Sequence, residues 1–142
     1  MILIRVIVGL VFLLEGVLKF VQPASLGTGR FAAIGLPFPN LLAPLGGGIE
    51  IGCGAAVLLN LFAGDAAIFL LVVIVTALIT TKVPILLGRP LGPFTLAKMN
   101  TYGWLTFFHE ARLDLTMIFG LVAIAIDSGV NMGRKRRWYQ DS

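Results

Sequence analysis

The sequence predicts an all-α integral membrane protein, a bundle of four transmembrane helices with both termini on the same side of the membrane. Of the 142 residues, 58% are hydrophobic and only 13% are charged, whereas about a quarter of the residues in a soluble domain are charged. A soluble domain of this length exposes too much of its surface to water for such a composition. The chain also contains four apolar segments that can each supply the roughly 20 residues of a transmembrane helix.

The expected helices cover about residues 2–21, 41–62, 66–87 and 104–127 of a transmembrane domain at residues 1–130, and residues 131–142 form a basic tail. A Gly- and Pro-rich linker follows the first helix, whereas the second and third are joined by a short antiparallel turn. Pro84 kinks or ends the third helix. The fourth helix must begin near Trp104, because the uncharged run 115–126 is too short to span by itself.

The positions of charged residues also bear on processing and orientation. Glu15 and Lys19 interrupt the first apolar segment, so that a retained helix fits better than a cleaved signal peptide. The basic run 134–137 predicts a cytoplasmic C-terminus, and hence a cytoplasmic N-terminus, although basic residues within 82–98 favour the opposite orientation. The expected membrane is a bacterial inner membrane or its equivalent. This run also supplies most of the net charge of +4, so the chain has no basic surface that would indicate nucleic-acid binding.

Ionisable residues are concentrated in one layer of the expected bundle. Measured from the face that carries the linker 21–40 and the loop 88–103, Glu15 lies about 9 Å deep and Glu50 about 13 Å deep. Ionisable residues inside a membrane generally mark a binding or conduction site, although paired charges could also serve only to fix the register of the helices. The candidate cofactor-binding residues in or near this layer are Glu15, Lys19, Glu50, Lys82, His109, Glu110, Arg112 and Asp114.

Residue spacing suggests how these charges pair. Glu15 and Lys19 are four residues apart, in the order that favours an ion pair on a helix. Glu110 and Asp114 are also four residues apart, which places two acids on one helix face. Two neighbouring acids require a proton or a cation between them. The ammonium group of Lys82 or Lys19 is the expected cation.

Glu50 is the deepest acid and has no cation four residues away on its own helix. We expect it to pair across helices with Lys19, Lys82 or Arg112, with His109 and Arg112 close by. Arg112 could instead reach the membrane interface. If Glu50 has no basic partner on another helix, it is either protonated or bound to a ligand.

Several other patterns narrow the chemistry. Gly48, Gly52 and Ala56 recur every four residues and predict a closely packed second helix or, alternatively, the seam of a homodimer. Cys53 is the sole cysteine, which excludes an intramolecular disulfide and a dithiol redox pair. His109 is the sole histidine, so neither a zinc site nor bis-histidine haem ligation is predicted, and no metal is expected. No catalytic residues are identified.

The order and spacing of short motifs resemble the DoxX family from about residue 4 to residue 127. The matching positions are Arg5, Gly9-Leu10-Val11-Phe12, Gly16, Lys19, Gly35-Leu36-Pro37, Glu50, Gly54, Lys82-Val83-Pro84, His109-Glu110-x-Arg112-x-Asp114 and Asp127. The resemblance implies a four-helix membrane protein and a link to quinone-coupled redox complexes.

Two functional classes follow from this resemblance. In the first, the chain is a non-catalytic accessory subunit of a larger quinone-linked redox or energy-transducing complex, in contact with lipids and other integral membrane subunits. In the second, it is the quinone- or small-molecule-binding subunit of an oxidoreductase such as a quinol oxidase or a thiosulfate:quinone oxidoreductase. The sequence does not identify a cofactor: a quinone and a lipid are the candidates for the polar layer, and no haem or metal is expected. The chain is not expected to be catalytic alone. A transporter is a third class, which would require oligomerisation.

Overall fold

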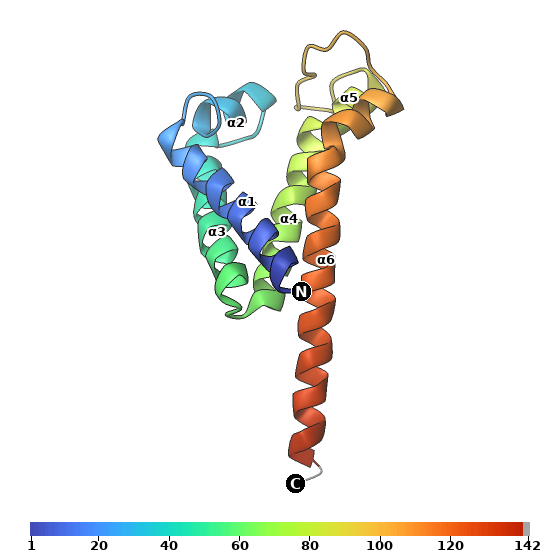
Figure 1. Ribbon diagram of the computed structural model, residues 1–142. Helices are drawn as coiled ribbons and strands as arrows, with labels where there is room; N and C mark the ends of the chain where they lie inside the picture. Colours follow the sequence, from blue (N-terminus) through green and yellow to red (C-terminus); the bar gives the residue numbers. More distant parts are fainter. Residues whose placement is uncertain (141–142) are drawn as a thin grey trace.

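The chain folds into helices that are arranged as two pairs. The computed structural model describes the backbone of residues 1–140 and the side chains of residues 1–129. Within residues 1–140 the regular structure is helical, apart from an isolated bridge between Leu91 and Phe94. The helices are α1 (Ile2–Val21), α2 (Thr28–Ile34), α3 (Pro39–Leu59), α4 (Ala63–Thr81), α5 (Val83–Leu87) and α6 (Trp104–Gln140) (Figure 1). The all-α prediction is confirmed.

Within residues 1–140, two stretches are long and apolar enough to cross a membrane. They are Pro39–Leu59, which is α3, and Ala63–Leu87, which contains α4 and α5. The other long helices carry more charge: α1 contains Arg5, Glu15 and Lys19, and the first turns of α6 contain the charged cluster 109–114. Composition therefore supports two spans among the described residues, whereas the membrane crossings of α1 and α6 remain predictions.

Proline residues mark the helix boundaries as the sequence indicates. Pro39 is the first residue of α3. Proline has no backbone N–H, and at this position no hydrogen bond is lost, because N–H groups in the first turn of a helix have no carbonyl acceptor within the helix. Along the chain, α4 ends at Thr81, and Pro84 lies in the first turn of α5. This is the interruption that the sequence predicts for the third segment.

The ends of the chain and the loops differ from the expected boundaries. The linker after α1 contains the short helix α2, and α6 continues to Gln140 instead of ending near residue 127. The backbone of residues 131–140 thus continues the helix that precedes it. The basic run 134–137 and Ser142 lie outside the residues whose side chains are described.

Glycines bring α1 and α3 into backbone contact. A Cβ atom added to Gly54 would lie 2.9 Å from the Leu13 nitrogen and 3.0 Å from the Gly9 oxygen. An added Cβ at Gly16 would lie 2.7 Å from the Gly47 oxygen. No larger residue fits these positions without moving one helix away from the other. The close helix packing that small residues permit is therefore used on this face of α3.

The apolar core joins the two pairs at one end of the molecule. Leu70 of α4 and Leu121 and Ile124 of α6 are almost fully buried, and they pack in one cluster with Val8 of α1 and Val57 of α3. At the same end an Arg5 guanidinium nitrogen donates a hydrogen bond to the Asn60 side-chain oxygen, which ties α1 to the turn between α3 and α4. We call this end, which holds the start of α1 and the α3–α4 turn, the turn end.

The two pairs diverge toward the opposite end, which we call the loop end (Figure 1). It holds α2, α5 and the loop at residues 88–103. Thr95 of this loop donates hydrogen bonds to α2, from its backbone N–H to the Ile34 oxygen at 2.8 Å and from its hydroxyl to the Ala33 oxygen at 2.7 Å. The loop of one pair therefore reaches the short helix of the other across the space between them.

Candidate functional site

A cavity of about 470 Å³ lies between the α1–α3 pair and the α4–α6 pair. Phe12, Ile74 and Met117 line it and belong to the buried core, so its base toward the turn end is apolar. Leu45 of α3 and Val72 of α4 also line the cavity but are largely exposed. The wall is therefore open sideways between α3 and α4, whereas α2 and Thr95 meet across the loop end.

Glu50 forms an ion pair with Lys19 at the cavity wall. The Lys19 ammonium donates to a Glu50 carboxylate oxygen at 2.6 Å, and the two side chains are only 13% and 7% exposed. Lys19 belongs to α1 and Glu50 to α3, so the expected pairing of Glu50 across helices is confirmed. The pair lies where glycines bring these two helices together, since a Cβ atom added to Gly47 would lie 3.3 Å from the Gly16 oxygen and 3.4 Å from the Lys19 Cβ.

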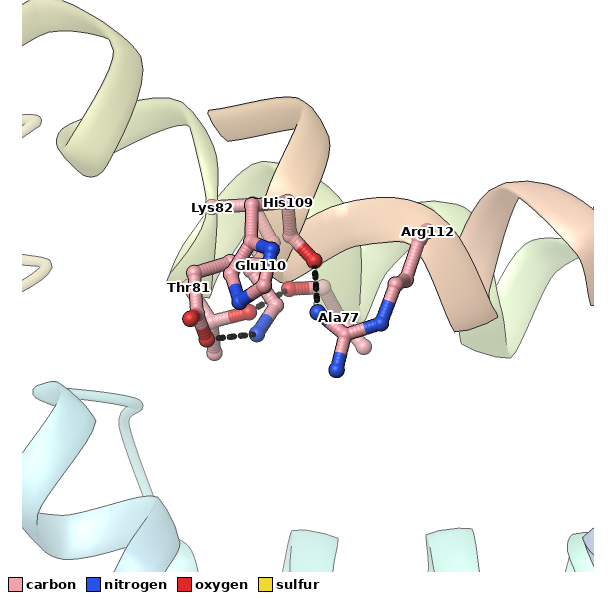
Figure 2. A network of polar contacts seen from close by, with 6 residues as sticks. All are labelled: Ala77, Thr81, Lys82, His109, Glu110 and Arg112. Carbon is pink, nitrogen blue, oxygen red and sulfur yellow. Dashed lines mark hydrogen bonds and ion pairs between the residues drawn. The ribbon is translucent and has the colours of Figure 1, made fainter. Parts of the chain in front are cut away.

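A second, looser ion pair lies on the facing wall. Lys82, between α4 and α5, places its ammonium 3.8 Å from a Glu110 carboxylate oxygen of α6 (Figure 2). Both side chains are partly exposed, at 17% and 32%. The neighbouring Thr81 hydroxyl donates to the Ala77 carbonyl at 2.6 Å within α4. Lys82 thus supplies the cation that the sequence led us to expect for one of the two acids on α6.

The remaining charged groups of the cavity have no such partner. Glu15 of α1, Asp114 of α6 and Arg30 of α2 line the cavity, but within the described part of the chain their side chains form no ion pair or hydrogen bond. Asp114 is nevertheless close enough to Arg30, Lys82 and Glu15 to interact with each electrostatically. Each of the two pairs of long helices therefore contributes one acid that is not neutralised by direct contact.

Six of the eight candidate residues line this cavity. They are Glu15, Lys19, Glu50, Lys82, Glu110 and Asp114. The expected pair between Glu15 and Lys19 does not form, because Lys19 points to Glu50 on the adjacent helix instead. Spacing along a helix shows which side chains share a face, but the choice of partner depends on what packs against that face.

His109 and Arg112 are exposed and do not line the cavity. The Arg112 guanidinium folds back along α6 and donates to the backbone oxygen of His109, as Figure 2 shows. Arg112 follows Glu110 by two residues, which turns it about 200° around the helix, away from the acids. The expectation that these two residues accompany Glu50 is therefore not met.

Three features of the site were not predicted from the sequence. Arg30 was overlooked because it lies in a linker that reads as a loop, although the Gly35 αL turn and the Thr95 contacts hold α2 over the cavity. Thr80 is buried on the α4 wall, where its hydroxyl donates to the Thr76 oxygen at 2.9 Å. Phe31 of α2 adds an aromatic side chain to the lining. The sequence does contain one signal for Arg30, because it is a charged residue within an otherwise uncharged linker.

The fold and this cavity define an all-helical protein of largely apolar helices around an open cavity with charged walls. The family model described as DoxX matches residues 1–83, and a relative described as an uncharacterized membrane protein, from Mycobacterium tuberculosis, is 44% identical over 119 residues. That alignment covers 84% of this chain and 69% of the relative. The chain is a membrane protein of the DoxX family, which confirms the resemblance drawn from its motifs. No solved structure gives a significant match.

Proposed function

We propose that the chain is a non-catalytic, ligand-binding subunit of a quinone-linked membrane complex. The cavity between the two helix pairs is the observation that carries this proposal, because it combines charged walls with an apolar base and a lateral opening. Its volume of about 470 Å³ falls within the range of small-molecule sites, roughly 300–1,000 Å³. Other integral membrane subunits supply the electron transfer that this chain does not perform alone.

In the proposed topology α1, α3, α4 and α6 all cross the membrane. The long helices alternate in direction, since α1 leads into α2 at the loop end, α3 and α4 join at the turn end, and α5 leads into α6 at the loop end (Figure 1). Four crossings then place both termini on one side, which we assign to the cytoplasm of a bacterial inner membrane from the basic run 134–137. The loop end faces the opposite side.

This topology places the cavity within the bilayer, in its loop-end half. Charged side chains at such a depth are costly unless they face protein, water or a ligand. The two ion pairs neutralise four of these groups, and Glu15, Asp114 and Arg30 remain. Helix registration accounts for the pairs, but it does not explain a cavity or the three groups without direct partners. A ligand-binding role accounts for the cavity and for these three charged groups.

The opening between α3 and α4 indicates that the ligand is lipid-soluble. Leu45 and Val72 at this opening would contact acyl chains, so a molecule dissolved in the bilayer can enter without crossing water. A quinone meets the requirement, because its ring can pack on Phe12 and Met117 while its carbonyl oxygens accept hydrogen bonds from Lys82 or Arg30. The alternative ligand is a lipid with a small polar head group, which has a similar shape.

Photolabelling tests this proposal. The chain, reconstituted in lipid nanodiscs, is illuminated with a short-tailed benzoquinone that carries an azide, and the adducts are mapped by mass spectrometry. We expect adducts on residues that line the cavity, including Phe12, Phe31 and Met117, and competition by an unlabelled short-tailed quinone. Adducts spread over lipid-facing residues such as Leu14 and Phe119, without competition, would contradict a binding site.

Two matched variants distinguish quinone binding in the cavity from binding on the outer surface. Ala77→Trp places a bulky side chain on a residue that lines the cavity and should abolish the competed labelling. Ala32→Trp makes the same change on the exposed part of α2, at a residue that does not line the cavity, and should leave labelling unchanged. Equal labelling of both folded variants would show that the quinone binds elsewhere.

A further inference from the structure

The charges of the cavity do not cancel once its ion pairs are counted. Lys19 pairs with Glu50 at 2.6 Å, and Lys82 pairs with Glu110 at 3.8 Å. Two carboxylates, Glu15 and Asp114, and one guanidinium, Arg30, are left among the described residues that line the cavity. With these groups ionised, the remaining charge is negative by one unit.

The two remaining carboxylates come from opposite walls. Glu15 extends from α1 and Asp114 from α6, and the two interact electrostatically across the cavity. α2 carries Arg30 at the loop end, and this residue also interacts with Asp114 without a direct contact. Lys82 also interacts with Asp114 but is engaged in the ion pair with Glu110. Glu15 and Asp114 are therefore the acids of the lining that a positive charge can approach without displacing an ion-pair partner.

The lining also contains aromatic and soft side chains. Phe12 from α1, Phe31 from α2 and Met117 from α6 line the same cavity. Phe12 and Met117 are three residues from Glu15 and Asp114, and therefore share their helix faces. Aromatic rings attract organic cations through their negative faces, and this attraction strengthens when water is excluded. An inorganic cation gains little from such walls, because it would lose its hydration shell without a set of oxygen ligands. The lining therefore fits a cation whose charge lies inside an apolar body.

We propose that the cavity binds lipophilic organic cations, with the cationic centre between Glu15 and Asp114 and the apolar body on Phe12, Phe31 and Met117. This inference rests on the proposed ligand-binding function of the same cavity and adds the charge of the preferred ligand. The lateral opening between α3 and α4 admits such a molecule from the bilayer, where lipophilic cations concentrate.

Two ions of nearly equal size and opposite charge provide the test. Binding of tetraphenylphosphonium and of tetraphenylborate is measured by equilibrium dialysis to the chain in nanodiscs of uncharged lipid, with empty nanodiscs as the correction for partitioning. We expect the phosphonium to bind at least about tenfold more tightly than the borate, because the remaining carboxylates attract one ion and repel the other. Equal affinities, or tighter binding of the borate, would overturn the proposal.

Substitutions locate the effect within the cavity. Glu15→Gln and Asp114→Asn should each weaken phosphonium binding by about tenfold, because each removes one of the two carboxylates while keeping the side-chain shape. Asp65→Asn is the matched control, since Asp65 is an exposed acid at the turn end and does not line the cavity. Unchanged binding in folded Asp114→Asn and Glu15→Gln would show that these carboxylates carry no charge in the site and would overturn the proposal.

A neutral probe separates this inference from the proposed function. The same nanodiscs are titrated with a short-tailed benzoquinone. If the quinone binds and the phosphonium binds no better than the borate, the cavity is a ligand site without a preference for cations, and this inference alone fails. If none of the three probes binds above the empty nanodiscs, the ligand-binding function fails as well.

Discussion

Lys19 and Glu50 form the closest contact between opposite charges in the described part of the structure. Their atoms lie 2.6 Å apart, and both side chains are largely buried between α1 and α3. A buried pair of this kind contributes little over two well-packed apolar residues, but the loss of one member leaves the other charge without compensation. The pair therefore matters most for what its disruption would cost.

Replacing Glu50 with Gln should destabilise the protein by about 3–5 kcal/mol, because Lys19 would then be a buried cation without a counterion. Thermal unfolding in mild detergent measures this loss. The double substitution Lys19→Met with Glu50→Leu should recover most of it, since it removes both charges at similar volume.

Glu110→Gln is the matched control for this prediction. Its partner Lys82 lies 3.8 Å away, and both side chains are more exposed than those of the Lys19–Glu50 pair. The expected loss is well under that of Glu50→Gln. A Glu50→Gln variant as stable as the parent protein would mean that Glu50 carries a proton and that the ion pair is not part of the folded state.

The charged residues of the site were easier to predict from the sequence than their ion-pair partners. The depth of each residue along its helix follows from chain position and from the rise per residue, and this grouped six of the seven charged residues that line the cavity. The partner of each side chain depends on the rotation of its helix about the helix axis. Lys19 faces α3 instead of Glu15, and Arg112 faces away from Glu50. The pattern of one helix does not contain this information, because it depends on the neighbouring helix.

At the scale of the helices, α3 shows which glycines are needed for close packing. Its repeat Gly48, Gly52 and Ala56 was expected to mark close packing within the bundle or a homodimer seam. Within the chain, added Cβ atoms at Gly48 and Gly52 would meet nothing within 4 Å. The contact with α1 instead uses Gly47 and Gly54, seven residues apart. Because α3 has small residues on several faces, its composition could not identify the face that packs.

This difference between the faces of α3 gives a matched pair of substitutions. Gly54→Ala should destabilise the protein by about 1–3 kcal/mol, because its Cβ would lie 2.9 Å from the backbone nitrogen of Leu13. Gly52→Ala should be neutral or stabilising by up to about 1 kcal/mol, since alanine favours the helix and the position is open. Denaturation in detergent, followed by circular dichroism, measures both changes. Equal effects of the two substitutions would contradict the described packing of α1 on α3.

At the scale of the whole molecule, the protein consists of two helix pairs that join at one end and diverge at the other. The apolar core of Val57, Leu70, Leu121 and Ile124 holds the turn end together, whereas charged residues line the space toward the loop end. The long helices were predictable from hydropathy and from the turn residues between them. The divergence of the pairs was not, because it results from the distribution of contacts between helices.

The same arrangement explains why the loop segments were harder to predict than the helices. The linker after α1 and the loop 88–103 are rich in Gly and Pro, so that neither has a hydrophobic period. Their structure depends on each other, because Thr95 of the loop bonds to the end of α2. This contact positions Arg30 over the cavity, and sequence periodicity gives no indication of it.

Cysteine accessibility in sealed vesicles tests the central claim, that four helices cross the bilayer and enclose the cavity within it. Single cysteines replace Ser25, Thr101, Asp65 and Ser142 in a Cys53→Ala background, which should remain folded because a lone, partly buried thiol acts as a small apolar group. We predict that a membrane-impermeant maleimide labels Ser25→Cys and Thr101→Cys from one side and Asp65→Cys and Ser142→Cys only from the other. Labelling of Ser25→Cys and Ser142→Cys from the same side would contradict the four crossings and remove the cavity from the bilayer.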